Sequence, residues 1–129
     1  MIRKTLAGVS FVAMVTVGLA ACGGGGGGGN ASTYPGNGNA DSGKTIALGK
    51  GGCASCHTIA GTTAAGKIGP ELTHVGTLLS ADQIYTQIVD PKQRPAPYAT
   101  PLQAGSSMPK PNLSAQEQAD VTAYLVTLK

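Results

Sequence analysis

The sequence predicts an all-α domain whose helices are joined by long loops. Three segments combine a capping residue with apolar residues at helical spacing, and no segment alternates apolar and polar residues as a strand does. The stretch from residue 91 to residue 111 contains six prolines, too many for a helix or a central strand. Loops of this length in a small domain usually wrap around something, so we expect them to enclose a ligand.

The first 21 residues predict an export signal. Arg3 and Lys4 give a positive start, Leu6 to Leu19 form an apolar stretch, and two alanines precede a cysteine. The apolar stretch is short for a bilayer span, which needs about 20 apolar residues. We therefore expect residues 1–21 to be cleaved, with an uncleaved signal anchor as the alternative.

The end of this signal, Leu19-Ala20-Ala21-Cys22, resembles the bacterial lipoprotein box. The resemblance implies that Cys22 becomes the lipid-modified first residue of the mature protein. Several acyl chains would anchor it firmly, since each buried CH₂ contributes about 0.8 kcal/mol. The alternative is an unmodified thiol beside an ordinary cleavage site. We expect an exported, membrane-anchored lipoprotein that faces the periplasm or the cell exterior.

Residues 22–40 are expected to form a flexible tether behind the lipidated cysteine. Seven consecutive glycines, Gly23 to Gly29, are followed by an uncharged segment without periodicity. Such a segment cannot bury enough apolar surface to offset its ordering entropy. From Cys22 to Asp41 a coil of this composition has a root-mean-square span of about 25 Å and a limit of roughly 65 Å.

The folded domain is expected over residues 41–129. A domain of this size has a thin core and usually needs a metal, a disulfide or a cofactor for stability. The sequence contains no Trp, and its single Phe, Phe11, lies in the signal. The formal charge of +3 falls to seven basic and six acidic residues once Arg3 and Lys4 are removed. A near-neutral domain lacks the basic surface of a nucleic-acid binder, so we expect no nucleic-acid partner.

The first helix of this domain is expected to begin at a cap formed by Asp41 or Ser42 and to run toward Gly52. Ile46 and Ala47 lie on the side expected to face the core. Glycines within the segment lower its own helical propensity, because each costs about 1 kcal/mol relative to alanine.

A capping box marks the start of the second helix. Ser80 and Gln83 form the box, Ile84 and Ile88 follow at the spacing of one helical face, and Asp90-Pro91 ends the helix. The segment before it, residues 58–79, contains turn-forming residues without a clear period and is expected to be a loop.

A second capping box, Ser114 with Glu117, begins the last helix. Behind it an apolar stripe follows helical spacing, through Val121, Tyr124, Leu125 and Leu128. We therefore expect this helix to pack against an apolar surface.

The chemistry lies in Cys53-Ala54-Ser55-Cys56-His57, which has the C-x-x-C-H spacing of a c-type haem attachment site. Two thiols separated by two residues on a helical turn can each form a thioether with one of two neighbouring vinyl groups. The adjacent histidine then lies under the iron and supplies one axial nitrogen. The sequence thus predicts one covalent haem bound through Cys53 and Cys56, with His57 as an iron ligand.

Three other interpretations of the motif are possible. A zinc site would need two histidines beside the cysteines, but only His57 and His74 exist, and a ligand adjacent to Cys56 is geometrically awkward. A thioredoxin-like redox pair would follow a strand of a βαβ unit, and no such pattern is present. A structural disulfide between Cys53 and Cys56 would close a strained ring.

Met108 is the predicted second axial ligand. It is the only methionine left after the signal is removed, and it lies in Ser107-Met108-Pro109 at the end of the proline-rich loop. Methionine and histidine ligation raises the reduction potential of a haem relative to two histidines. A lone methionine can instead fill a core, and His74 is the competing ligand, 17 residues after His57.

The order of these features resembles a small monohaem class I cytochrome c over residues 41–129. The resemblance rests on the C-x-x-C-H motif, Ile68-Gly69-Pro70-Glu71-Leu72, Ser107-Met108-Pro109 and the closing Tyr124-Leu125 helix. It implies a fold of three main helices with long loops wrapped around the haem. It also implies that the Pro70 carbonyl fixes the ring of His57, that Leu72 packs on the haem, and that Tyr124 crosses the first helix at Gly43 or Gly49.

With both axial positions filled, the resemblance implies a one-electron carrier rather than an enzyme. We expect redox proteins as partners, such as an oxidase, a reductase or another cytochrome, and a monomeric chain held at the membrane by its lipid anchor. One alternative is a haem enzyme or gas sensor with a displaceable sixth ligand, which would bind carbon monoxide rapidly. The other is a fixed accessory subunit of a respiratory or extracellular electron-transfer complex.

Overall fold

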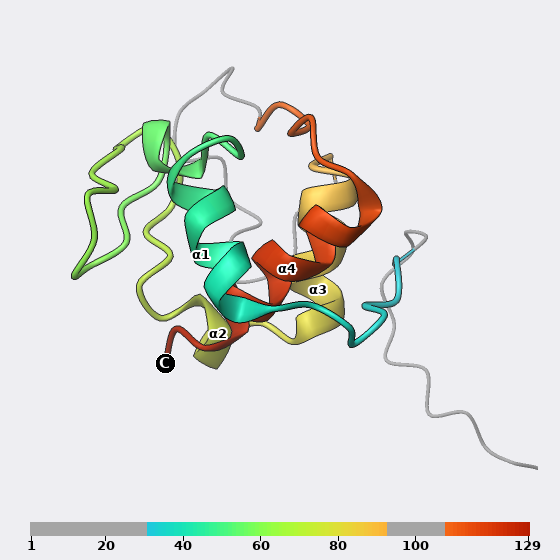
Figure 1. The fold of residues 1–129 in the computed structure, drawn as a ribbon. Helices are drawn as coiled ribbons and strands as arrows, with labels where there is room; N and C mark the ends of the chain where they lie inside the picture. Colours follow the sequence, from blue (N-terminus) through green and yellow to red (C-terminus); the bar gives the residue numbers. More distant parts are fainter. Residues whose placement is uncertain (1–30, 93–107) are drawn as a thin grey trace, which may run out of the picture.

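The computed structural model describes residues 31–92 and 108–129, and these residues form a helical domain (Figure 1). Its elements, in chain order, are α1 (Ala40–Leu48), the 3-10 turn η1 (Cys53–Ser55), α2 (Val75–Leu78), α3 (Ala81–Val89) and α4 (Ala115–Val126). No strand occurs in the described ranges, where one isolated bridge joins Thr58 and Ala65. The predicted all-α domain with three main helices is confirmed.

The two terminal helices of the domain, α1 and α4, cross in direct contact at Gly43 (Figure 1). A Cβ atom built on Gly43 would lie 3.0 Å from Cβ of Tyr124 and would overlap the backbone carbonyl of Asp120. At Gly49 the nearest contact among the described residues is the Thr45 carbonyl of the same helix, at 3.2 Å. Tyr124 therefore crosses the first helix at Gly43, one of the two glycines that the family resemblance implied.

The starts of the three main helices are fixed by side-chain caps. Ser80 and Ser114 each accept a hydrogen bond from the amide three residues later, and both predicted capping boxes are complete. The cap of α1 was predicted wrongly. Asn39, not Asp41 or Ser42, accepts from the Ser42 amide at 2.9 Å, because an asparagine in extended conformation satisfies the helix amides equally well.

Helix α2 is an element that the sequence did not predict. It spans four residues within the segment expected to be a loop, and its position comes from tertiary contact. The Gly76 amide donates to the carbonyl of Leu128 at 2.8 Å, and the Lys129 ammonium donates to the carbonyl of Gly76 at 2.8 Å. A Cβ on Gly76 would lie 2.7 Å from the carbonyl carbon of Val126. The chain end is thereby attached to α2.

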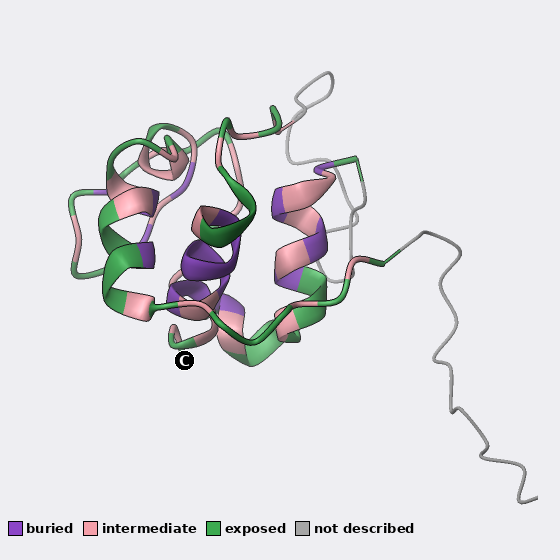
Figure 2. Ribbon diagram, turned by 45° about the vertical axis from the view of Figure 1, so that its right-hand side comes forward, coloured by how far each residue is buried: buried purple, intermediate pink, exposed green. Residues whose placement is uncertain are grey.

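The core is small, and Tyr124 is its one aromatic side chain among the described residues. Figure 2 shows buried residues concentrated on α4, which lies inside the other elements. The predicted apolar stripe is confirmed at its first three positions, whereas Leu128 follows the end of α4 and is half-buried. The buried cluster consists of Ala47, Ile59, Ala64, Val75, Leu79, Ile84, Ile88, Val121, Tyr124 and Leu125.

Residues 31–39 belong to the folded part, although the sequence placed them in a flexible tether. Ser32 and Tyr34 hydrogen-bond to side chains of α3, and Asn39 hydrogen-bonds to α4. Polar residues that bury little apolar surface are here ordered by hydrogen bonds to neighbouring helices. These contacts place residues 32–39 against helices that follow the expected boundary at residue 41. The predicted signal, Cys22 and the rest of the tether lie outside the described residues.

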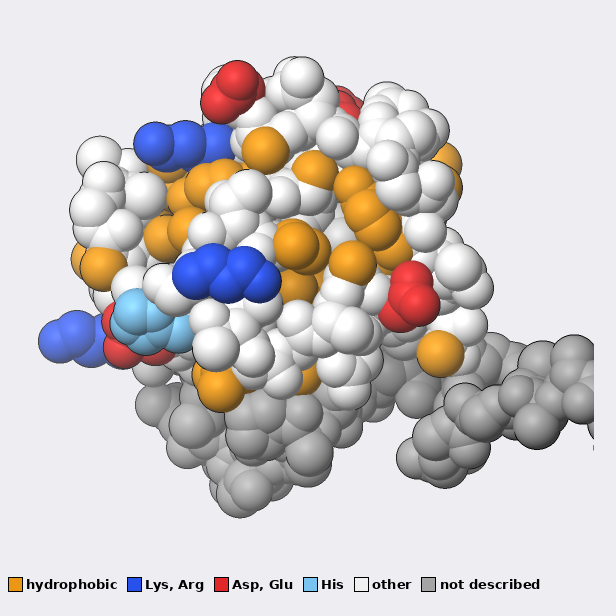
Figure 3. All heavy atoms as spheres, turned by 90° about the horizontal axis from the view of Figure 1, so that it is seen from below, with side chains coloured by type: hydrophobic (Ala, Val, Ile, Leu, Met, Phe, Trp, Pro, Cys, Tyr) orange, Lys and Arg blue, Asp and Glu red, His pale blue; other side chains and the backbone are white. Residues whose placement is uncertain are grey.

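The described surface carries charges of both signs. On the face shown in Figure 3, basic and acidic side chains are scattered between hydrophobic ones. Two large hydrophobic side chains, Ile68 and Leu78, are about half exposed. Within residues 31–92 and 108–129, no helix has the length and hydropathy needed to cross a membrane.

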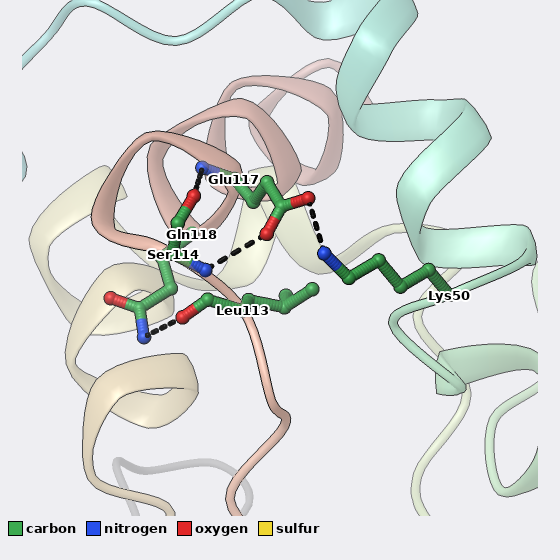
Figure 4. Close-up of polar contacts among 5 residues, drawn as sticks. All are labelled: Lys50, Leu113, Ser114, Glu117 and Gln118. Atoms are coloured by element: carbon green, nitrogen blue, oxygen red, sulfur yellow. Dashed lines mark hydrogen bonds and ion pairs between the residues drawn. The ribbon is translucent and has the colours of Figure 1, made fainter.

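An ion pair links the segment after α1 to the start of α4 (Figure 4). The Lys50 ammonium lies 2.7 Å from Oε1 of Glu117, whose Oε2 accepts a hydrogen bond from the Ser114 amide at 2.8 Å. Beside them, the Gln118 side-chain amide donates to the Leu113 carbonyl at 3.3 Å. The hydrogen bond from Lys50 and that from Ser114 lower the pKa of the Glu117 carboxyl. One carboxylate thus caps α4 and connects it to α1.

Replacing Gly43 with Ala should destabilise the domain, because the added methyl group forces α1 away from the Asp120 carbonyl. Overpacking of this kind costs about 1–3 kcal/mol. Denaturant unfolding of the haem-loaded protein measures the loss. Gly49→Ala is the matched control, and it should cost much less because its methyl group would meet only its own helix. Equal losses of unfolding free energy in the two variants would show that the contact between α1 and α4 does not require a glycine at position 43.

The Lys50–Glu117 pair should contribute stability that depends on pH. The folded-state pKa of Glu117 is depressed, so the contribution is present above the unfolded-state pKa and is lost as pH falls through the folded-state pKa. Lys50→Met should therefore lower stability at neutral pH and have little effect in acid. Unfolding midpoints across this range provide the measurement. A Lys50→Met effect of constant size at every pH would contradict the pairing.

Candidate haem site

The cysteine motif forms a tight turn that begins shortly after α1, at Cys53. Gly52, at φ +68°, adopts the left-handed conformation that favours glycine and starts η1. The His57 amide donates to the Cys53 carbonyl at 2.9 Å, so the turn continues through the motif. Cys53, Cys56 and His57 thereby line one pocket, and no disulfide joins the two cysteines.

His57 is oriented by a hydrogen bond to the loop that follows the motif. Its Nδ1 lies 2.7 Å from the Pro70 carbonyl oxygen. Because a carbonyl only accepts, Nδ1–H is the donor, and Nε2 keeps its lone pair for a metal. The residue is 8% exposed, which limits rotation of the ring. The Pro70 contact implied by the family resemblance is present, and it fixes the tautomer and orientation of the candidate ligand.

Gly69 passes close behind the His57 ring. A Cβ atom on Gly69 would lie 2.7 Å from Nδ1 and 3.0 Å from Nε2. The Gly69 amide also donates to the Cys56 carbonyl at 2.7 Å. Any larger residue at position 69 would displace the imidazole from Pro70. The sequence analysis gave Gly69 no role of its own, although its place beside Pro70 was the available signal.

Met108 lines the same pocket as the motif, although 50 residues separate it from His57 in the sequence. It lies on the segment that leads into α4 and is half-buried. The structure thus brings together the four residues predicted to hold the haem. The described lining consists of Gly51, Gly52, Cys53, Ser55, Cys56, His57, Met108, Pro109 and Pro111.

Two other candidate residues lie away from the described lining of this pocket. His74, the competing ligand, is exposed at the N-cap of α2. Leu72 is half-buried against the core, and its packing on the haem stays a prediction. Met108 and His74 were the two candidates for the second axial position. Of these, only Met108 lies with His57 in the described pocket lining.

The environment of Cys53 bears on the alternative interpretations of the motif. Burial raises the pKa of the Cys53 thiol, and neighbouring Cys56 adds to the shift. A catalytic redox pair needs the opposite, a lowered pKa that favours the thiolate. Within residues 31–92 and 108–129, no three His, Cys, Asp or Glu residues cluster in a way that could hold a metal ion.

The residues present fit a covalently attached haem. Two thiols on one turn can form thioethers, the Nε2 of His57 can supply an axial nitrogen, and the sulfur of Met108 can supply the other axial ligand. Thioether and imidazole donors without a nearby carboxylate cluster match the ligand set of haem iron in cytochromes c. The Lys50–Glu117 pair connects the residues just before the motif to the start of α4, which follows the Met108 segment.

Solved structures of two proteins resemble this fold. A chain of the crystal structure of SoxXA from P. pantotrophus is 27% identical, with a TM-score of 0.53 over 71% of this chain and 82% of that one. The c-type cytochrome SorU from Sinorhizobium meliloti is 24% identical, with a TM-score of 0.50 over 68% of this chain and 87% of that one. No individual curated protein gives a significant sequence match.

A family comparison covers the domain from its first helix to its last residue. The cytochrome c family matches residues 40–129 of this chain. This range begins with the first residue of α1. It contains the C-x-x-C-H turn, the His57–Pro70 contact and the α1–α4 crossing described above. The chain therefore belongs to the cytochrome c family, whose members transfer electrons through an iron-containing haem bound covalently to the protein.

Proposed function

We propose that this protein is a lipid-anchored, monomeric one-electron carrier with a single c-type haem. Cys53 and Cys56 hold the haem through thioethers, and His57 and Met108 are its axial ligands. The lipoprotein box at Cys22 supports export and anchoring at a membrane surface that faces the periplasm or the cell exterior. Its partners are other redox proteins, such as an oxidase, a reductase or a second cytochrome.

The observation that carries this proposal is the position of Met108. The fold brings its side chain to the pocket that His57 and both cysteines line. His57 reaches this pocket from the turn after α1, and Met108 reaches it from the segment before α4. A pocket with a nitrogen ligand and a sulfur ligand leaves no iron position for a substrate, which favours an electron carrier over an enzyme.

The protein orients the His57 ring and keeps the same residues available as iron ligands. When bound, the haem supplies one-electron exchange between ferric and ferrous iron. The Pro70 carbonyl holds the proton on Nδ1 of His57 and thereby keeps the same nitrogen available in both oxidation states. Gly69 allows the loop to approach the ring closely enough for this contact. Ligands that stay in place during electron transfer keep structural rearrangement small.

The wild-type protein, produced in an exporting, haem-attaching host, should show a c-type absorption spectrum. Its oxidised form should have the far-red band that marks methionine sulfur on ferric haem. Met108→Ala should abolish this band, lower the reduction potential and let carbon monoxide bind rapidly to the reduced protein, because the sixth position opens. Absorption spectroscopy and redox titration give these readouts.

His74→Ala is the matched control, since His74 is the competing ligand and lies away from the pocket lining. This variant should keep the far-red band, the potential and the resistance to carbon monoxide. Loss of the band in His74→Ala, or its survival in Met108→Ala, would overturn the ligand assignment. Rapid carbon monoxide binding by the wild type would favour a sensor or enzyme instead.

A further inference from the structure

The segment in front of α1 lies along the outer side of α3 and α4, in the lower right of Figure 1. At its start, the Ser32 amide donates to Oγ1 of Thr86 at 2.9 Å, and the same hydroxyl donates to the Ser32 carbonyl at 3.1 Å. Thr86 is 6% exposed. A buried hydroxyl on α3 therefore satisfies its donor and acceptor roles with the backbone of one residue.

The next contact extends the attachment along α3. The Tyr34 amide donates to Oδ1 of Asp82 at 2.7 Å, and the rings of Tyr34 and Tyr85 are 5.9 Å apart at a tilted angle. The Tyr34 hydroxyl accepts from the Gly38 amide at 3.2 Å. These contacts fold the segment onto α3 through both its backbone and its ring.

The end of the segment is attached to α4. Asp120, 8% exposed, accepts from the Asn39 amide at 2.8 Å and from the Gln116 side chain at 2.9 Å. Gln116 in turn donates to the Asn37 carbonyl at 3.1 Å. A Cβ atom on Gly38 would overlap the Ala119 carbonyl, so the backbone lies directly on α4. A nearly buried carboxylate that has two amide donors gives the attachment a charge-assisted anchor point.

We propose that residues 32–39 are a docked strap that shortens the membrane tether and fixes where it leaves the domain. The first residue of the strap, Ser32, is bonded to Thr86 on α3. The turn η1 and the Met108 segment lie at the top of Figure 1. With the strap docked, only the chain from Cys22 to Ser32 separates the lipid from the domain. This length spans at most about 35 Å, compared with roughly 65 Å for a tether that reaches residue 41. The shortened reach of the tether depends on the proposed lipid anchor. The docking of residues 32–39 on the domain does not.

The strap thus restricts the kind of partner that the domain can serve. A domain held within about 35 Å of its membrane exchanges electrons with redox centres presented at that same surface. A tether of roughly 65 Å would let the domain sample redox centres further from that surface. The partner expected from this geometry is a redox protein that is bound to, or docks at, the anchoring membrane.

Amide hydrogen exchange of the mature haem-loaded protein tests the strap without reference to lipidation. The Ser32 and Tyr34 amides should be protected in the wild type. Thr86→Val keeps the side-chain volume but removes both hydrogen bonds, so it should raise Ser32 exchange roughly tenfold. Thr45→Val is the matched control, because the Thr45 hydroxyl bonds to the Asp41 carbonyl within α1. This control should leave Ser32 protection unchanged.

Unprotected Ser32 and Tyr34 amides in a wild type whose α3 amides are protected would overturn the strap. So would a Thr86→Val variant with wild-type protection at Ser32. If Thr86→Val fails to fold, Asp82→Ala gives the same test at the Tyr34 amide. A wild-type level of Tyr34 protection in that variant would also overturn the strap.

The reach is tested with lipidated protein on phospholipid vesicles that carry a fluorescent headgroup, which nearby haem quenches. The double variant Thr86→Val, Asp82→Ala releases the start of the strap from α3 while leaving its α4 contacts intact, so the tether lengthens and part of the wild-type quenching should be lost. Equal quenching by the two proteins would refute the shortened reach. Protected strap amides in a protein found to lack lipid would refute the anchor and leave the strap intact, which separates the two proposals.

Discussion

The rest of this structure depends on the close contact between α1 and α4 at Gly43. Only a residue without a side chain lets α1 lie against the Asp120 carbonyl of α4. The C-x-x-C-H turn begins at Cys53, shortly after α1 ends, and Met108 lies seven residues before α4. The distance between the two helices therefore determines whether His57 and Met108 line the same pocket. Among the described residues the core has one aromatic side chain, Tyr124, and it lies at this crossing.

Polar contacts then orient the functional side chains next to the helices α1 and α4. The Pro70 carbonyl fixes the His57 ring, and the Lys50–Glu117 pair joins the residues before the motif to the cap of α4. The strap connects α3 and α4 from outside, because its first residues bond to Thr86 and its last to Asp120. Polar contacts between segments distant in sequence thus supplement the thin apolar core.

The features that could be predicted from the sequence are those determined by residues close together in the chain. The Ser80 and Ser114 boxes and the C-x-x-C-H motif act through neighbouring residues, so their spacing alone identified them. Helix α2 could not be predicted, because its four residues have no period and are held by the Leu128 carbonyl. The strap was missed for the same reason, since its order comes from hydrogen bonds to α3 and α4 rather than from composition. The role of Gly69 depends on the position of a ring twelve residues earlier.

The central claim is that one haem is bound covalently by Cys53 and Cys56 in the pocket that this fold forms. The most direct test is the mass of the denatured mature protein, compared with that of the double variant Cys53→Ser, Cys56→Ser made in the same host. The account predicts a wild-type chain heavier by the mass of a single haem, with no added haem in the variant. A bare wild-type chain, or a variant that retains covalent haem, would contradict it.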